Sequence, residues 1–443
     1  MKISYFFWMV VLFAFIVRVF LAFFSLQYRE NTDILRYRDW ARTAYLHSLA
    51  DTYTQKYLTF GTLPNNQPPG SLYILSAFYN VNILFAKVVL RVTSHTPEVY
   101  AWLSGQALNF MLRLPSIIAD CLIGVGVWFY FGKPKFRTYR VLATLIILFN
   151  PVFIFNSAIW GQMDSIVVLF FLLSVYFLEK KRMLWSMVCL TMSLFVKVFS
   201  IYTLPLFSIL WWKLEKNKTT LLLGIMTSFL LSIGLVLPVS LQPLGWMYWY
   251  VTHSLIGEMT NITIFAMNFW WMLFRPFVTI GDPGDMFSFS SVHLNSAPLS
   301  SVTIYGVSLF TIAIIIFISF AVVLCFPLIR SKIVSSKELW KTFSLIALSA
   351  FLFLPQMHER YIYLALVLLG ISVGFDRKLL PYYLLLSFCN MVNVYIVWHP
   401  MRLSFFPYEI WTNAQFQWAI SIVTVITSMT LFFQSIHENY RKI

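Results

Sequence analysis

Ionisable side chains that could do chemistry are sparse in this chain, because only 11% of its 443 residues are Asp, Glu, Lys or Arg. Asp33 follows shortly after an apolar stretch (residues 3–24) that is long enough to cross a bilayer. A carboxylate held at a membrane surface could accept a proton from a hydroxyl group that arrives from the water. Asp33 is therefore the candidate general base.

Asp164 and Lys197 occupy two further polar positions between apolar segments. Asp164 ends the run NSAIWGQMD, where it either caps the next helix or supplies a second carboxylate to a site. Lys197 separates two short apolar segments, and it either extends its ammonium group to the membrane surface or binds a phosphate as a point charge. Both are candidate substrate-binding residues.

His358, Glu359 and Arg360 form a charged triplet in LPQMHERYIYL, between two apolar segments. Three ionisable groups exceed what a tight turn requires, and Pro355 marks the end of the preceding helix. Arg113 opens another apolar segment, where it faces either lipid phosphate or a substrate. All four charged residues are therefore candidate substrate-binding residues.

Four other ionisable residues have structural explanations. Arg18 and Asp120 lie inside apolar segments, where burial of a charge is costly unless it is paired. An ion pair between them is preferred to a substrate contact. Asp39 and Asp51 are predicted to lie on solvated faces of surface helices.

The sequence predicts no metal site and no cofactor. No pair of the candidate residues has metal-ligand spacing such as His-x-x-x-His, although a divalent cation between Asp33 and Asp164 stays open. The chain has four cysteines, all within apolar stretches at scattered spacings. They are interpreted as small buried residues rather than as metal ligands or disulfide partners.

The elements that must position these residues are membrane-spanning helices. Hydrophobic residues make up 59% of the chain, and apolar stretches of roughly 20 residues recur along it. The net charge of +15 collects in short loops, as in cytoplasmic loops of membrane proteins, and indicates no nucleic-acid partner. The predicted fold class is therefore an all-α, polytopic transmembrane protein with about 11–13 spans, surrounded by membrane lipids.

The basic loops also predict a topology. If all of them are cytoplasmic, both termini are inside and two long segments, 25–110 and 239–301, are outside. Residues 71–92 are apolar enough to span, but a crossing there would place two basic loops outside. They are expected to lie along the outer leaflet or to dip into it, with a second surface helix over 39–49. The whole chain, 1–443, is predicted to be one domain.

Segments 163–178, 184–196 and 198–212 are short and are expected to be tilted, broken or half-buried, and only Lys197 separates the last two. Segments 184–196 and 198–212 are each shorter than the roughly 20 residues that a hydrocarbon core of about 30 Å requires. Broken helices inside a membrane usually line a cavity rather than face lipid. The short segments on either side of Lys197 therefore support a functional interpretation of this residue.

Six motifs, in this order, resemble those of the GT-C superfamily of integral-membrane glycosyltransferases, above all the bacterial branch similar to the second GPI mannosyltransferase. They are TDILRYRDWA (32–41), NQPPGSLY (66–73), RLPSIIAD (113–120), NPVFIFNSAIWGQMDS (150–165), FVKVFSIYTLPL (195–206) and LPQMHERYIY (354–363). Together they cover most of the chain. Two positions depart from the branch: Gln67 replaces the usual Tyr before Pro-Pro, and Val198-Phe199 replaces Pro-Gln after Lys197.

The resemblance implies a GT-C type fold whose large first external loop carries surface helices and the catalytic base, here Asp33. It implies a polyprenyl-phosphate-linked sugar donor and a glycan or glycolipid acceptor. The expected reaction is inverting transfer of a hexose, mannose-like in kind, to a lipid-linked or envelope glycan. The expected location is the bacterial cell (inner) membrane, as a multi-pass protein with an extracytoplasmic active site.

The candidate residues also fit this chemistry independently of the resemblance. A polyprenyl-phosphate sugar already has a good leaving group, so the enzyme needs a base for the acceptor and cations for the departing phosphate. Lys197 and Arg360 are the leading cations, with Arg113 and His358 as further candidates. The aromatic run WMYWY (246–250) could stack on sugars or belong to the interfacial belt.

Two alternatives come from other classes of protein. A transporter or a lipid-linked-oligosaccharide flippase would account for the intramembrane Arg18 and Asp120 and for the broken helices. The lack of an inverted repeat and the one-sided loop at 25–110 favour the enzyme. A non-catalytic subunit of an envelope-polysaccharide complex is the third possibility.

Overall fold

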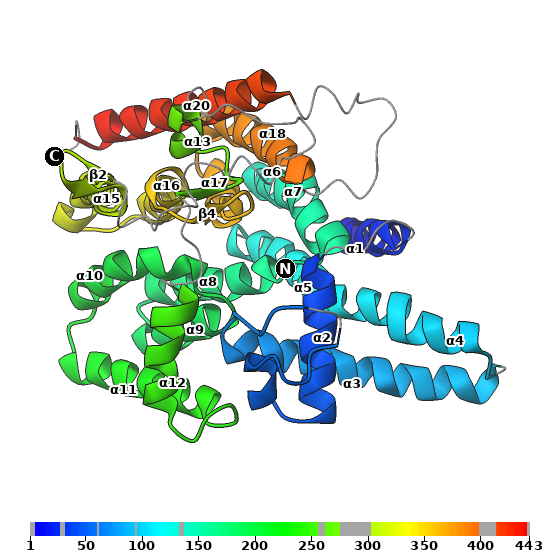
Figure 1. The fold of residues 1–443 in the computed structure, drawn as a ribbon. Coiled ribbons are helices and arrows are strands. Elements are labelled where there is room, and N and C mark those ends of the chain that lie inside the picture. The colour runs from blue at the N-terminus through cyan, green and yellow to red at the C-terminus, as the bar shows by residue number, and fades with distance from the viewer. Residues whose placement is uncertain are drawn as a thin grey trace. The chain divides into compact units, whose positions relative to one another are not determined.

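A computed structural model describes residues 5–26, 32–59, 62–93, 95–132, 137–255, 262–274, 303–397 and 413–440. The described chain is almost entirely helical (Figure 1). Its strands are two residues long: β1 (Thr263–Ile264) pairs in parallel with β4 (Met357–His358), and β2 (Thr303–Ile304) pairs antiparallel with β3 (Val307–Ser308). The all-α prediction is confirmed.

Eight helical stretches within the described residues are long and apolar enough to cross a membrane. They are Tyr5–Ser25, Pro69–Val92, Pro97–Tyr130, Tyr139–Trp160, Lys218–Val236, Leu309–Arg330, Arg377–Val397 and Ala414–Glu438. Shorter apolar helices occupy Met183–Val196, Val198–Leu214 and Tyr363–Val373. This architecture confirms the prediction of a polytopic helical membrane protein.

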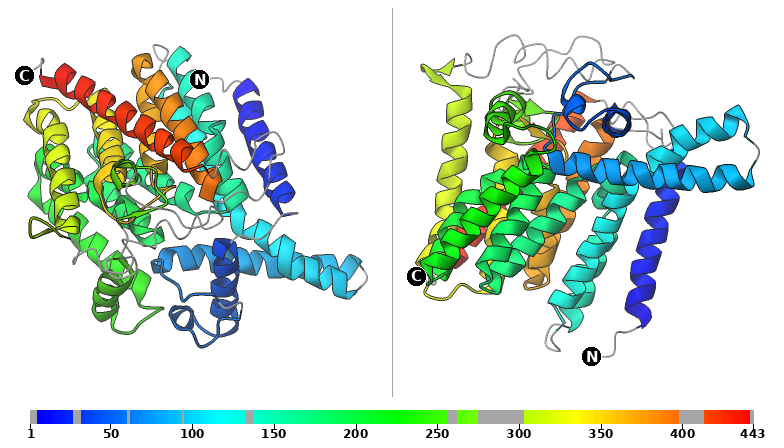
Figure 2. Two further views of the ribbon diagram at one scale, coloured as in Figure 1. Left: turned by 45° about the horizontal axis from the view of Figure 1, so that its top comes forward. Right: turned by 90° about the horizontal axis from the view of Figure 1, so that it is seen from below.

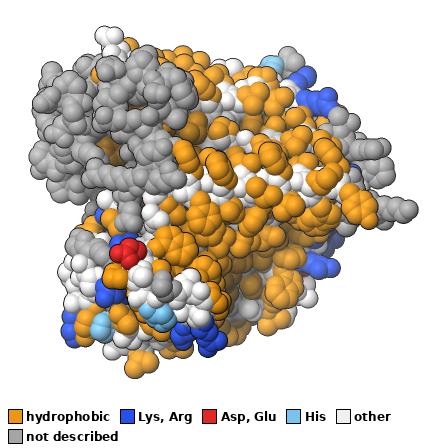
Figure 3. All heavy atoms as spheres, turned by 90° about the vertical axis from the view of Figure 1, so that its right-hand side faces the viewer, with side chains coloured by type: hydrophobic (Ala, Val, Ile, Leu, Met, Phe, Trp, Pro, Cys, Tyr) orange, Lys and Arg blue, Asp and Glu red, His pale blue; other side chains and the backbone are white. Residues whose placement is uncertain are grey.

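The described surface has the character expected of lipid-facing helices. Figure 3 shows a face covered mostly by hydrophobic side chains, with Lys and Arg side chains toward its margins. The helix Lys218–Val236, for example, exposes Leu222, Ile225, Phe229 and Leu230. Exposed apolar surface of this extent is rare in water-soluble proteins and is satisfied by lipid.

The chain divides into two compact units, each built from segments that are far apart in the sequence. Unit 1 contains Met1–Phe129, Phe153–Ile201 and Leu214–Ile256, and unit 2 contains Tyr130–Val152, Tyr202–Lys213 and Gly257–Ile443. The predicted external regions, 25–110 and 239–301, therefore do not coincide with the units. Short helices α7 (Pro151–Ile154) and η5 (Val198–Thr203) fall where the chain passes from one unit to the other.

Unit 1 begins with the helix of the first apolar stretch and continues with helices that follow it in the chain. In chain order they are α1 (Tyr5–Ser25), α2 (Thr32–Leu46), η1 (Ala50–Tyr53), α3 (Pro69–Val92), α4 (Pro97–Trp102), η2 (Leu103–Ala107), α5 (Leu108–Tyr130), η4 (Phe155–Trp160), α8 (Asp164–Glu179), α9 (Met183–Val196), α11 (Lys218–Val236), α12 (Pro243–Trp249) and η6 (Tyr250–Leu255). The surface helix expected over 39–49 thus begins already at Thr32.

Helices α1 and α5 run antiparallel. Phe7, near the start of α1, stacks on Trp128, near the end of α5, with ring centroids 4.3 Å apart. Helix α3 instead runs across α1 at the end where α1 finishes (Figure 2). Its length and apolar character would also allow it to span, so the expected position of residues 71–92 along the membrane surface stays a prediction.

Unit 2 packs around two buried helices. Its elements are α6 (Arg137–Leu148), α10 (Leu204–Leu214), α13 (Phe269–Phe274), α15 (Leu309–Arg330), α16 (Ser336–Phe353), α17 (Tyr363–Val373), η8 (Arg377–Leu379), α18 (Leu380–Val397) and α20 (Ala414–Tyr440), with the short strands. Every residue of α17 is buried, as is every residue of α16 from Leu339 onward. A helix that is apolar on all sides belongs in the interior of a bundle.

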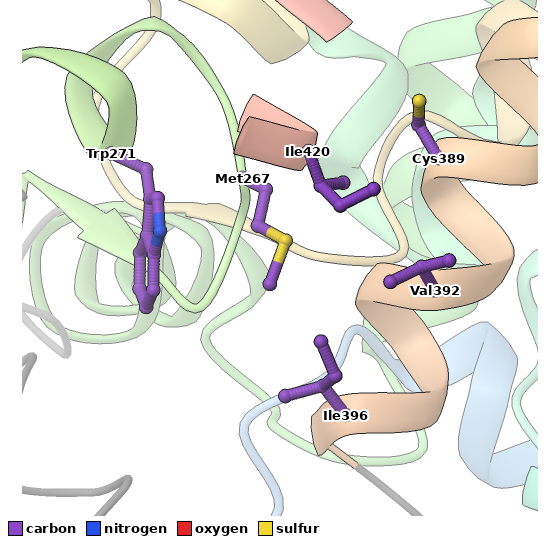
Figure 4. Close-up of a cluster of buried hydrophobic side chains, with 6 residues drawn as sticks. All are labelled: Met267, Trp271, Cys389, Val392, Ile396 and Ile420. Atoms are coloured by element: carbon purple, nitrogen blue, oxygen red, sulfur yellow. The ribbon is translucent and has the colours of Figure 1, made fainter. Parts of the chain in front are cut away.

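A hydrophobic cluster joins three segments of unit 2 beside this core. It consists of Met267, Trp271, Cys389, Val392, Ile396 and Ile420 (Figure 4). These side chains come from α13 and the segment before it, from α18 and from α20. The cluster holds the β1 segment near α18, and β1 in turn pairs with the β4 strand that carries His358.

Candidate functional site

Asp33 lies in the first turn of α2. Its Oδ2 atom accepts hydrogen bonds from Trp160 Nε1 at 2.9 Å and from Gln162 Nε2 at 2.6 Å. Arg36 Nη1 lies 3.9 Å from Asp33 Oδ1. The side chain is 21% exposed, so a hydroxyl group from solvent can reach the carboxylate.

The two donors come from a tight turn between η4 and α8. Gly161 in this turn has a φ of 85°, in the left-handed region that favours glycine. A Cβ atom at Gly161 would lie 2.7 Å from Ile34 Cδ1 and 2.9 Å from Arg113 Cγ. The turn therefore packs directly on the start of α2, which explains why its side chains reach Asp33.

Gln162 connects Asp33 to two other polar side chains. Its Oε1 atom accepts a hydrogen bond from Lys197 Nζ at 3.4 Å and one from the Tyr37 hydroxyl at 3.2 Å. The Tyr37 hydroxyl in turn accepts from Gln67 Nε2 at 3.1 Å. One amide thus joins the candidate base to the candidate phosphate-binding cation.

Lys197 and Asp164, predicted as separate substrate contacts, form a buried ion pair. Lys197 Nζ lies 2.7 Å from Asp164 Oδ1, with side-chain exposures of 8% and 0%. Asp164 Oδ2 accepts a hydrogen bond from Asn156 Nδ2 at 3.2 Å. Since either charge would be costly to bury alone, Asp164 is the counter-ion of Lys197. Asp164 is also the first residue of α8, but the N-cap position belongs to Met163, so the alternative in which Asp164 caps the helix is wrong.

Of the three alternatives predicted for the short segments (tilted, broken or half-buried), the structure shows a break at Lys197. Helix α9 ends at Val196, and Lys197 has extended backbone angles, φ −164° and ψ 134°. The start of α3 abuts this break, because a Cβ atom at Gly70 would collide with the carbonyl group of Phe195. The motif at 66–73 therefore meets the motif at 195–206.

Arg113 holds the end of α1. Its Nη1 atom donates to the Ala22 carbonyl at 3.2 Å and to Ser25 Oγ at 3.0 Å, and the side chain is buried. Because the last carbonyl groups of a helix have no partner within it, a buried cation there stabilises the helix end. Contact between Arg113 and a substrate stays a prediction.

The predicted ion pair between Arg18 and Asp120 is confirmed. Arg18 Nε lies 3.1 Å from Asp120 Oδ2, and both side chains are buried. Ser157 Oγ donates to the same carboxylate oxygen at 2.6 Å. These contacts join α1, α5 and η4 and account for both charges structurally.

The prediction that Asp39 is solvated is wrong. The side chain is fully buried, and its carboxylate accepts from Thr59 Oγ1 at 2.9 Å and from Thr62 Oγ1 at 2.6 Å. The reason is that the segment after η1 folds back over α2. Asp51, in η1, is partly exposed and accepts from Ser48 Oγ at 2.6 Å.

Four residues of this network were not among the predicted site residues: Trp160, Gln162, Tyr37 and Gln67. Tyr37 lies one helical turn after Asp33, and residues at this spacing occupy the same helix face, so the pattern contained the signal. Gln67 lies in the motif at 66–73, and the sequence marked it only as a departure from the branch that the chain resembles. Its role depends on a loop whose path periodicity does not predict.

The triplet His358, Glu359 and Arg360 lies in unit 2, between α16 and α17. Arg360 Nη1 lies 2.6 Å from Glu359 Oε1, and His358 Nδ1 lies 3.7 Å from Glu359 Oε2. Asn390 Nδ2 donates to the Glu359 carbonyl at 2.6 Å. Glu359 is therefore the buried anchor, and the two cations are its more exposed partners.

The pKa of Glu359 reflects this pairing. Burial by itself raises the pKa of the carboxyl group, but the charge of Arg360 and the neighbouring His358 lower it, to a net value of about 2. Glu359 is therefore ionised at neutral pH. A binding role for Glu359 itself stays a prediction.

Metal ligation has no support among the described residues. No group of three or more His, Cys, Asp or Glu side chains gathers there in a way that could hold a metal ion. The four cysteines are free thiols, with Cys121, Cys325 and Cys389 buried and Cys189 partly buried. Asp33 and Asp164 are connected through Gln162 and Lys197.

Unit 1 thus joins a partly exposed carboxylate to an ammonium group through one amide. A carboxylate can accept a proton, and an ammonium group can stabilise an anion that develops beside it. Comparison with protein-family models and with curated proteins finds no match for the chain.

Proposed function

We propose that the protein is a membrane glycosyltransferase that moves a hexose, mannose-like in kind, from a polyprenyl-phosphate-linked donor to a lipid-linked or envelope glycan. One observation carries the proposal. The Gln162 amide lies 2.6 Å from Asp33 Oδ2 through Nε2 and 3.4 Å from Lys197 Nζ through Oε1. A base and a cation are thereby held on opposite atoms of one rigid group.

Asp33 acts as the general base in this proposal. The acceptor hydroxyl oxygen attacks the anomeric carbon from the side opposite the phosphate, and its proton passes to the Asp33 carboxylate. The bond between the anomeric carbon and the phosphate oxygen breaks, and its electron pair leaves with the polyprenyl phosphate. The anomeric configuration inverts, and no external reductant or oxidant takes part.

Lys197 stabilises the departing phosphate. Its buried counter-ion, Asp164 at 2.7 Å, keeps the ammonium charge compensated before the donor binds. A phosphate that approaches Lys197 makes a charge-assisted hydrogen bond in a site with little water. Arg113, also in unit 1, is a further candidate contact. Substrate contacts of Arg360 and His358 in unit 2 stay separate predictions.

The contacts of Arg18 and Asp120 favour the enzyme over a transporter or flippase. A translocation path needs charged groups that face a water-filled route. Arg18 and Asp120 instead pair at 3.1 Å with side-chain exposures of 0% and 3%. In this proposal the active site faces the extracytoplasmic side of a bacterial cell membrane, where acceptor glycans are assembled.

Transfer and translocation can be separated with purified protein in liposomes that contain a radiolabelled polyprenyl-phosphate mannose. An enzyme releases polyprenyl phosphate when a glycolipid extract of the envelope is added, and it transfers the label to that extract. Movement of uncleaved donor between the leaflets, without transfer, would instead support the flippase. If the purified protein catalyses neither reaction while native membranes transfer the label in the same assay, the result would support the non-catalytic subunit.

A further inference from the structure

The turn before α3 is fixed by hydrogen bonds to its backbone. The backbone N–H of Asn65 donates to the Thr52 carbonyl at 2.8 Å. The Tyr53 hydroxyl donates to the Gln67 carbonyl at 2.9 Å, and the Tyr250 hydroxyl donates to the Asn66 carbonyl at 3.1 Å. Residues 65–67 are thus held between η1 and η6, and their side chains are presented by a rigid backbone.

Two side-chain amides in this turn each keep one buried polar atom that makes no hydrogen bond. They are Asn65 Nδ2, a donor, and Gln67 Oε1, an acceptor. Asn65 is only 2% exposed. Native proteins satisfy nearly all buried polar atoms, so a donor and an acceptor without partners in one turn point to a ligand that supplies both. A sugar hydroxyl supplies both.

Aromatic rings lie directly beside this turn. The Tyr53 ring makes edge-to-face contacts with Trp246 and Trp249, with centroid distances of 5.3 and 6.5 Å. Trp249 also stacks on His253 at 5.7 Å. Trp246 and Trp249 are partly exposed, and His253 is exposed. Aromatic rings of this kind offer apolar faces to the C–H groups of a sugar ring.

The same turn is connected to the candidate base. Gln67 Nε2 donates to the Tyr37 hydroxyl at 3.1 Å, and that hydroxyl donates to Gln162 Oε1 at 3.2 Å. Gln162 in turn holds Asp33. Gln67 therefore has one amide atom in the network around the base and the other without a protein partner.

We infer that Asn65 and Gln67, together with Tyr53, Trp246 and Trp249, form a carbohydrate-binding subsite that holds the sugar bearing the attacking hydroxyl group. The identification of this sugar as the acceptor rests on the proposed function. An interfacial aromatic belt would explain the indole groups, but it would not explain two unpartnered amide atoms buried in the adjacent turn.

The subsite can be tested without any transfer reaction. The protein is placed in lipid nanodiscs free of glycoside detergents, and binding of methyl α-mannoside is measured by saturation-transfer NMR. Trp249→Ala and Gln67→Met should each weaken binding by about five- to ten-fold, the usual effect of one lost contact. Trp249→Phe, which keeps a ring, should bind within about two-fold of the parent protein.

Trp185→Ala serves as the matched control, because Trp185 is an exposed indole on α9 of the same unit. It should leave binding unchanged. Sorbitol, which has hydroxyl groups but no ring face, should not compete with methyl α-mannoside. Equal affinity in the parent, Trp249→Ala and Gln67→Met proteins, or no binding by the parent, would overturn the subsite. A protein that binds the sugar but transfers nothing keeps the subsite and refutes the proposed transferase.

Discussion

Asp33 and Gln162 are separated by 129 positions in the sequence, yet their side chains meet at 2.6 Å. The contact fixes one carboxylate oxygen of Asp33 toward the turn between η4 and α8. It also makes Gln162 a positioning residue, because the other atom of the same amide accepts from Lys197. The geometry of the proposed base therefore depends on a neutral residue that takes no part in the proposed proton transfer.

Replacement of Gln162 should impair catalysis without unfolding the protein. Gln162→Leu removes the donor to Asp33 and the acceptor for Lys197, so we expect turnover to fall by roughly ten- to a hundred-fold, as for one or two lost charge-assisted hydrogen bonds. Gln162→Glu places a second carboxylate beside Asp33. Like charges disfavour ionisation, so the acid limb of the activity profile should move to higher pH.

The exposed Gln242 provides the matched control for these variants. Gln242→Leu and Gln242→Glu should leave both turnover and the pH profile unchanged. An unchanged acid limb in an active Gln162→Glu protein would mean that Gln162 does not act on the catalytic base.

Gly161→Ala should destabilise unit 1 and lower activity together. The substitution strains a backbone with φ 85° and places a methyl group against Ile34 and Arg113. The backbone strain alone costs about 1–3 kcal/mol. Thermal unfolding in detergent should show a lower midpoint, whereas Gly234→Ala in α11, where nothing lies within 4 Å, should not lower it. Equal midpoints for both variants would contradict this account of the turn.

Lys197 and Asp164 should behave as a coupled pair. Lys197→Met leaves Asp164 as an uncompensated buried charge, which costs about 3–5 kcal/mol of stability. The double variant Lys197→Met with Asp164→Asn should recover most of that stability but not donor binding, if Lys197 contacts the phosphate. A melting midpoint and a donor KM measured for the parent, both single variants and the double variant separate the two effects. Normal donor KM in the double variant would restrict Lys197 to a structural role.

Glu359 should make stability depend on acid pH. Its pKa is about 2 in the folded protein, against an ordinary value of 4.5. The unfolded chain therefore binds a proton between these values that the folded protein does not, and stability falls as pH decreases from 4.5 toward 2. The contribution is about 3 kcal/mol. In Glu359→Gln the midpoint of thermal unfolding should change less between pH 4.5 and pH 2 than in the parent protein. Glu215→Gln should keep the pH dependence of the parent.

The sequence predicted the class of fold and the local features well, because these depend on short stretches. Apolar length predicted the membrane helices and the short segments on either side of Lys197, and the start of α8 at Asp164 followed from residue type. The ion pair between Arg18 and Asp120 was predictable because two opposite buried charges need each other.

Long-range contacts were beyond such reasoning. The burial of Asp39 depends on the return of Thr59 and Thr62 over α2, which no periodicity indicates. The pairing of Lys197 with Asp164 depends on how α8 and α9 pack. Helix packing is set by side-chain shapes across the interface, which a single sequence does not reveal.

The most direct test of the central claim is the turnover of Asp33→Asn in the liposome transfer assay. This variant keeps the shape of the side chain and removes its ability to accept a proton, so turnover should fall by about 10²–10⁴ while donor binding persists. Asp51→Asn, in the same segment but outside the network, should stay within about two-fold of the parent. Near-normal turnover of Asp33→Asn, with Asp164→Asn or Glu359→Gln inactive but folded, would place the base elsewhere and contradict the account.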